Sequence, residues 1–135
     1  MAFPEGSADG SIPAGPDLVV RADDRGIILF VSRTCEELLG YEPDELVGEL
    51  GIDFVHPEDQ ARFLQNTLSV FQANPPSSER RVHRYLHKDG SWIWLRGNPK
   101  ILLVGGRPGK ELLNFLEPIS AEAALTALGL ETGPA

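Results

Sequence analysis

The sequence predicts one α+β domain, in which an antiparallel sheet carries its helices on one side. Its 135 residues are the usual size of a single domain. Runs of residues typical of strands occupy the first and last parts of the predicted domain, and segments typical of helices lie between them. An Asp-Gly pair at residues 89–90 separates two long strand-like runs, which is a strong hairpin signal.

The composition is that of a soluble intracellular domain. Hydrophobic residues make up 41% of the chain and charged residues 24%, which is ordinary for a globular fold. A single cysteine cannot form an intramolecular disulfide, so a cytoplasmic setting is expected. No apolar run is long enough to span a bilayer, and the N-terminus lacks the features of a signal peptide.

Charge is unevenly distributed along the chain. The net charge of −8 argues against direct binding of nucleic acid by the whole surface. Residues 1–60 hold three arginines against fourteen acids, whereas residues 61–110 hold nine basic residues against two acids. This asymmetry would suit a partner or a second copy of the chain. The favoured interpretation is that neighbouring solvated faces of one domain differ in charge.

The N-terminal part combines a flexible leader with a hairpin. Residues 1–16 are rich in Pro, Gly and Ser without apolar periodicity. Order is expected from Asp17, with strands at 18–20 and 27–31 joined by turn residues 23–26. The second strand is continuously apolar, which predicts burial on both faces.

Three helical segments follow. Ser32 or Thr34 is expected to cap the first, which stops at Gly40. Pro43 begins the second, which ends at Gly48. The longest starts at Pro57 and ends at 74–76, and its apolar face is predicted to consist of Ala61, Leu64, Leu68 and Phe71.

The remaining chain reads as three antiparallel strands at 79–87, 92–104 and 111–116, with turns at 89–90 and 105–109. Pro99 implies a bulge or an edge position. The domain is expected to span 17–119. Residues 120–135 then form a short helical or disordered tail, with Ser120 as the cap and Gly129 at the end of a helix over 121–128.

Several motifs occur in an order that resembles the PAS domain family. They are Gly-Ile-Ile-Leu-Phe-Val-Ser at 26–32, Leu-Leu-Gly-Tyr-Glu-Pro-Asp-Glu-Leu-Val-Gly at 38–48, Val-His-Pro-Glu-Asp at 55–59, and Arg84 with Lys-Asp-Gly-Ser at 88–91 and Trp94. The resemblance covers about residues 17–119. It implies a five-stranded antiparallel sheet flanked by short helices and one longer helix, with an activity set by what occupies the pocket between sheet and helices.

The cofactor of such a pocket is unknown from the sequence, but two classes are disfavoured. Flavin photoreceptors of the family carry Asn-Cys-Arg-Phe-Leu-Gln directly after the Gly that corresponds to Gly48. Here Arg-Phe-Leu-Gln at 62–65 begins fourteen positions later and lacks the thiol. Haem-binding members use a helix His, and residues 57–74 contain none.

The other reactive side chains have structural interpretations. His56, directly before Pro57, is read as part of the helix start rather than as a metal ligand. His83 and His87 lie about 13 Å apart on a strand, too far to share an ion. Cys35 is read as a small buried hydrophobe. No catalytic set is present, so an enzyme is not expected.

The residues expected to line a pocket are mostly apolar, and core packing is the alternative for each of them. Arg84 either fixes an anionic ligand or pairs with an acid at the edge of the core. The two Trp residues share one strand face, as a ligand floor or as a partner surface. The candidates are Leu29, Val31, Leu39, Phe54, Leu64, Leu68, Arg84, Trp92, Trp94 and Phe115.

Two functions remain open. The first is a sensory domain of a signalling protein, such as a sensor kinase or transcriptional regulator, which detects a small molecule or relays a conformational change to an output module outside this chain. The second is an interaction module without a ligand that dimerises or binds a partner protein through its sheet. Neither requires a membrane or direct contact with nucleic acid.

Overall fold

The computed structural model describes residues 17–72, 74, 77 and 80–130. The leader predicted at 1–16, the end of the tail at 131–135 and part of the segment between the long helix and the next strand lie outside these residues. No helix in the described part is both long and apolar enough to cross a bilayer.

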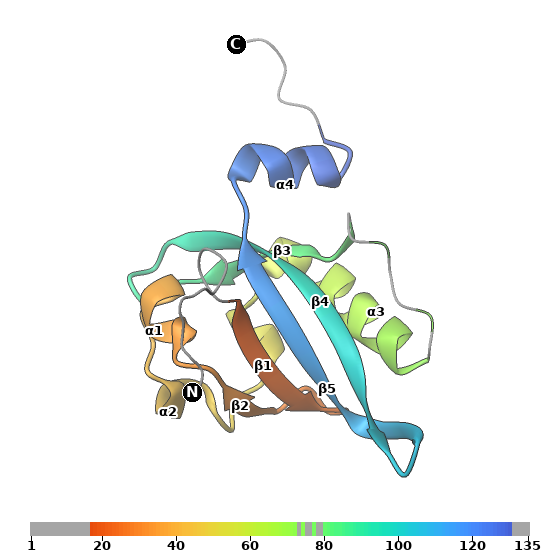
Figure 1. Ribbon diagram of the computed structural model, residues 1–135. Coiled ribbons are helices and arrows are strands. Elements are labelled where there is room, and N and C mark those ends of the chain that lie inside the picture. The colour runs from red at the N-terminus through yellow and green to blue at the C-terminus, as the bar shows by residue number, and fades with distance from the viewer. Residues whose placement is uncertain (1–16, 73, 75–76, 78–79, 131–135) are drawn as a thin grey trace, which may run out of the picture.

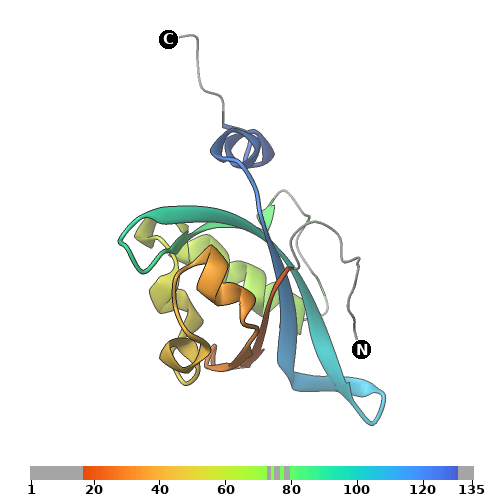
Figure 2. The same cartoon turned by 60° about the vertical axis from the view of Figure 1, so that its left-hand side comes forward.

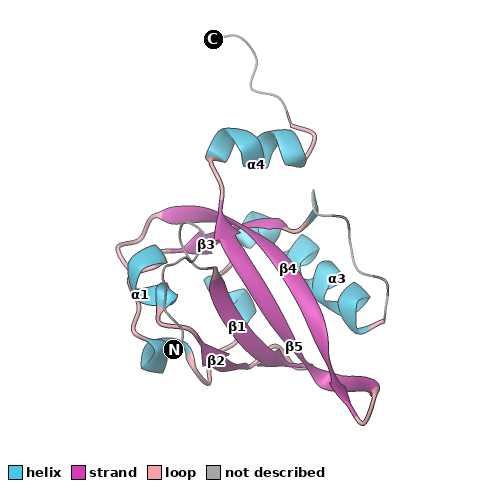
Figure 3. Cartoon of the chain, viewed as in Figure 1, coloured by secondary structure: helices cyan, strands magenta, loops and turns pink. Residues whose placement is uncertain are grey.

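Five strands form one antiparallel sheet, which confirms the predicted fold. The elements are β1 Leu18–Asp23, β2 Ile28–Val31, α1 Thr34–Leu38, α2 Pro43–Leu46, two 3₁₀ turns at Gly51–Phe54 and Pro57–Asp59, α3 Gln60–Phe71, β3 Val82–Leu86, β4 Trp92–Val104, β5 Arg107–Pro118 and α4 Ala121–Ala127. The strands lie side by side in the order β2-β1-β5-β4-β3, so the two ends of the chain supply the sheet and its middle supplies the helices (Figures 1 and 3).

The helices α1, α2 and α3 lie on one side of the sheet, and α4 projects beyond the end of β5 (Figure 2). The core fills the space between these two layers. Leu18 and Leu95 of the sheet are buried there, as are Cys35 of α1 and Val55 before α3. The other side of the sheet is the outer face.

Glycines in the left-handed backbone region form the turns of the two later predicted hairpins, β3–β4 and β4–β5. Gly105 and Gly106 have φ of 58° and 80° between the paired residues Val104 and Arg107, which is the backbone that a two-residue hairpin turn requires. The predicted turn at 105–109 is therefore shorter than expected. Gly90 has φ 95° and donates its N–H to the His87 carbonyl, as the hairpin prediction requires, in a loop one residue longer than Asp-Gly alone.

Pro99 lies in a strand that is internal at one end and an edge at the other. β4 pairs with β3 only through residues 92–96, whereas β5 accompanies β4 from 95 to 104. Beyond Arg96 one side of β4 therefore has no strand neighbour, and a residue without an N–H is tolerated there. The edge position predicted for Pro99 is confirmed.

Two local predictions are wrong. The β2 run is not buried on both faces, because Phe30 is 46% exposed on the outer face, opposite Arg21. Neither Ser32 nor Thr34 caps α1. The Ser32 hydroxyl instead accepts the Val19 N–H at 2.9 Å, which ties the end of β2 to β1.

Candidate functional site

A pocket of about 120 Å³ lies between the inner face of the sheet and α3. The strands supply most of its apolar wall, and the long helix covers it. The lining residues of α3 are Phe63, Asn66, Thr67 and Val70, and the sheet contributes, among others, Leu18, Val20, Leu112, Asn114 and Leu116. This is the space that the sequence predicts for a ligand or for a packed core.

The face that α3 turns toward the pocket differs from the predicted one. Leu64 and Leu68 are 51% and 50% exposed, whereas Asn66 and Val70 are buried. Residues 63, 66, 67 and 70 have the spacing of one helix face. The sequence pattern misled because this inner face carries two polar residues, Asn66 and Thr67. The Thr67 hydroxyl donates to the Phe63 carbonyl one turn earlier, at 3.0 Å.

The inner face of β5 also differs by one residue from the prediction. Leu112, Asn114 and Leu116 line the pocket, so Phe115 between them lies on the outer face. Its strand neighbours are Val19 on β1 and Asn98 on β4. Because side chains alternate along a strand, a shift of one residue exchanges the two faces of the sheet.

The two tryptophans of β4 lie outside the pocket, whose wall in this strand is made by Gly97 and Pro99. Trp92 is 39% exposed, and its ring centroid lies 4.6 Å from that of His56. The Arg84 guanidinium lies 5.0 Å from the centre of the Trp94 ring, in the geometry of a cation–π contact. Neither ring is a floor for a ligand in this pocket.

Three of the ten predicted residues line the pocket: Val31, Leu39 and Phe54. Leu29 does not, because the register between β1 and β2 shifts at this point and leaves Leu29 as the extra residue of a bulge. Five more of the predicted residues lie on parts of α3, β4 and β5 that do not face the pocket, as described above: Leu64, Leu68, Trp92, Trp94 and Phe115. Arg84 belongs to a separate polar network.

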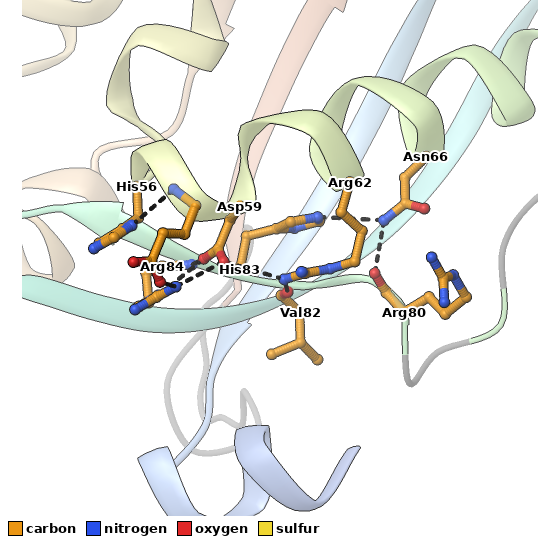
Figure 4. A network of polar contacts seen from close by, with 9 residues as sticks. His56, Asp59, Arg62, Asn66, Arg80, Val82, His83 and Arg84 are labelled. Atoms are coloured by element: carbon orange, nitrogen blue, oxygen red, sulfur yellow. Dashed lines mark hydrogen bonds and ion pairs between the residues drawn. The ribbon is translucent and has the colours of Figure 1, made fainter. Parts of the chain in front are cut away.

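That network joins the start of α3 to β3 (Figure 4). The buried Asp59 carboxylate accepts the backbone N–H of Arg84 at 2.8 Å, its Nε at 3.0 Å and one terminal nitrogen at 2.9 Å. Burial alone would raise the pKa of Asp59, but the hydrogen bonds and charge of Arg84, with the charge of Arg62, hold this pKa below its usual value. Of the two interpretations of Arg84, the pairing with a buried acid is the one observed.

Asn66 and His83 are two of the polar residues in the pocket wall. The Asn66 Nδ2 lies 2.6 Å from the Arg80 carbonyl and 3.2 Å from the His83 Nε2 (Figure 4). Burial, and then the positive charge of Arg62, lower the pKa of His83 to about 4 against the opposite effect of Asp59. At neutral pH the imidazole is therefore uncharged.

Three residues of the pocket wall are not among those predicted from the sequence: His83, Tyr85 and Asn66. His83 and Tyr85 both line the pocket from β3, and their rings make edge contacts with each other and with Phe63. The signal that would have found them is the alternation of side chains along the strand, since residues 83 and 85 share one face.

The structural interpretations of His56 and Cys35 are confirmed. The His56 Nδ1 accepts the Glu58 N–H at 3.0 Å and so caps the turn before α3. Cys35 is fully buried, its thiol donates to the Tyr41 carbonyl, and burial raises its pKa. A protonated, inaccessible thiol is not a nucleophile.

Comparison with known families agrees with this architecture. The sequence model of the PAS fold family matches residues 28–108. The chain belongs to the PAS family. Its match runs from β2 through the helices, β3 and β4 to the start of β5, whereas β1 and most of β5 lie outside it.

Curated relatives of this PAS domain are much longer proteins. The aryl hydrocarbon receptor nuclear translocator homolog of Drosophila melanogaster is 30% identical over 80 residues, which are 59% of this chain and 12% of that protein. The human basic helix-loop-helix ARNT-like protein 2 is 36% identical over 76 residues (52% and 12%). The white collar 2 protein of Neurospora crassa is 35% identical over 71 residues (52% and 13%). The chain thus spans about an eighth of their length.

Solved structures share the fold. The wild-type Drosophila melanogaster Cycle PAS-B domain with bound ethylene glycol, and a variant of it with bound glycerol, each superpose with a TM-score of 0.65. Each is 21% identical and covers 76% of this chain and 99% of its own. At this identity the similarity establishes the architecture, and the chemistry of the pocket has to be argued from its own residues.

Proposed function

We propose that this PAS domain is the sensory input module of a larger regulatory protein and binds a small, largely apolar molecule between its sheet and α3. The observation that carries the proposal is the pocket of about 120 Å³. Well-packed cores contain few voids larger than a water molecule, whereas an engineered apolar cavity of about 150 Å³ in another protein holds benzene. The function proposed for this PAS domain is binding of a ligand, with no catalytic step.

The relatives favour a transcription regulator over a sensor kinase as the larger protein. One of them is named for a basic helix-loop-helix, a DNA-binding element that works as a dimer. In such a protein this domain leaves nucleic acid to another module and passes its signal to an output domain or a partner protein. Cys35 is a free thiol, which suits the cytoplasm or another reducing compartment.

The test is binding of benzene to the purified domain, followed by amide chemical shifts in NMR. We expect saturable shifts at residues of α3 and β5 that line the pocket, such as Val70 and Leu112. Val70→Phe should fill part of the pocket and weaken benzene binding at least about tenfold, because benzene would then overpack the remaining space. Leu64→Phe, on the exposed side of the same helix, is the control. Absence of saturable binding to the parent domain would refute the sensory proposal.

A second function, dimerisation or partner binding, is favoured by the outer face of the sheet. The register places Phe115 opposite Val19 and Phe30 opposite Arg21 on this face. None of the described helices covers its centre (Figure 2). Phenylalanine side chains on an open sheet face are typical of a contact surface.

The second function is tested by sedimentation equilibrium of the parent domain and of Phe30→Asp. If the outer face is the contact surface, the parent should form a dimer and the variant a monomer of unchanged stability. If the parent is monomeric at all concentrations, the outer face can serve only for binding of a partner protein. A pull-down with the parent domain, with Phe30→Asp as the control, then tests partner binding.

A further inference from the structure

The side chain of Tyr85 brings a hydrogen-bond donor to the wall of the pocket. Tyr85 is 7% exposed and lines the pocket. No residue that the structure describes makes a hydrogen bond to its hydroxyl. Burial raises the pKa of this phenol, so it keeps its proton. A hydroxyl on the wall of a largely apolar pocket can donate a hydrogen bond to a ligand that enters it.

The neighbouring His83 offers a second donor, and its tautomer follows from the contacts of Asn66. The Arg80 carbonyl can only accept, so the Asn66 atom 2.6 Å from it must be the amide nitrogen. The second hydrogen of that nitrogen is then directed to the His83 Nε2 at 3.2 Å. An imidazole that accepts at Nε2 and is uncharged carries its hydrogen on Nδ1. Among the described residues nothing accepts this Nδ1–H.

The two donors lie on the same face of β3 and within one pocket. The centroids of the His83 and Tyr85 rings are 6.2 Å apart, and the Phe63 ring makes an edge contact with both. The remaining wall is largely apolar. A carbonyl oxygen has two lone pairs and can accept from both donors, and a neutral carbonyl compound avoids the cost of burying a charge in this largely apolar pocket.

We infer that the pocket selects a small neutral carbonyl compound, whose oxygen accepts hydrogen bonds from Tyr85 and His83 while its hydrocarbon part fills the space below α3. The ligand has about the size of benzene, because the pocket of about 120 Å³ is slightly smaller than the engineered benzene cavity. This inference rests on the proposed sensory function and adds the chemical class of the ligand.

The test compares cyclohexanone with methylenecyclohexane, which replaces the carbonyl oxygen by a methylene group at nearly the same shape. Both are titrated by NMR into the parent domain, Tyr85→Phe and Tyr41→Phe. Tyr41→Phe is the control, because Tyr41 is the other tyrosine of the chain and packs against Phe54 rather than lining the pocket.

We expect Tyr85→Phe to weaken cyclohexanone binding about threefold to tenfold, the range of one hydrogen bond. The affinity for methylenecyclohexane should stay within about twofold, and Tyr41→Phe should change neither. Equal changes for both compounds in Tyr85→Phe would overturn the assignment of the carbonyl while leaving the sensory proposal intact. Failure of the parent to bind either compound would overturn both.

A measurement on the parent fold covers the case in which Tyr85→Phe does not fold. Labelling with 3-fluorotyrosine gives two ¹⁹F signals, and Tyr41→Phe identifies the one that belongs to Tyr85. Cyclohexanone should shift the Tyr85 signal more than methylenecyclohexane does at equal occupancy. Equal shifts would contradict a hydrogen bond to the hydroxyl.

Discussion

Acidification from pH 7 to pH 5 should destabilise this domain mainly through His83. Its side chain is buried, and its pKa of about 4 lies well below the ordinary value of 6.5. In this window the unfolded chain takes up a proton at His83 and the folded chain does not, so protons favour unfolding. A depressed folded-state pKa means that the stabilisation is complete above pH 6.5 and is lost progressively as the pH falls toward 4.

The size of the effect follows from the two pKa values. Linkage between 6.5 and about 4 gives a loss of about 2 kcal/mol between pH 7 and pH 5. Asp59, the buried acid of the polar network, affects stability in a different pH range, because its pKa lies below 3.8. Its stabilising contribution is present above that value and is lost only at lower pH, outside the window.

The assay is urea unfolding at pH 7, 6 and 5, followed by the fluorescence of Trp92 and Trp94. His83→Gln is the matched variant, since a glutamine offers Asn66 a neutral acceptor and does not titrate. The other two histidines are present in both proteins, so their effects cancel in the difference. The parent should lose about 2 kcal/mol more than the variant over this range. Parallel pH profiles would refute a neutral buried His83.

Three further substitutions test other parts of the structure. Asp59→Asn should cost about 2–4 kcal/mol in urea unfolding, because Arg84 would lose its buried carboxylate; a cost below about 1 kcal/mol would contradict a central role for this pair. Gly40→Ala and Gly48→Ala both place a side chain at positive φ, but only at residue 40 would the Cβ meet the His87 ring, at 2.9 Å. Gly40→Ala should therefore cost about 1 kcal/mol more, and equal thermal midpoints would count against this contact. Val70→Ala should destabilise by about 2 kcal/mol and Leu64→Ala by less than about 0.5 kcal/mol, because only residue 70 is buried; the reverse order would restore the helix face that periodicity suggests.

The sequence by itself determined the order and type of the elements. Turn chemistry at Gly90, a Pro at the start of α2 and the capping His56 act within a few residues of chain, so they can be read without knowing the fold. The order of strands and helices then restricts the chain to an antiparallel sheet with helices on one side, and the motifs at 26–59 and 84–94 match one family.

The tertiary structure decided which side of each element faces the pocket. Along β5, residues 113 and 115 are as apolar as 112 and 116, so composition cannot tell the two faces apart, and a shift of one residue exchanges them. On α3 the exposed leucines form the more apolar face, while the inner face carries Asn66, which is satisfied by the Arg80 carbonyl and His83 from residues 14 and 17 positions away. A buried polar side chain depends on partners that only the fold brings within hydrogen-bond distance, and for that reason the pocket-lining residues Asn66, His83 and Tyr85 emerge from the structure and not from the sequence.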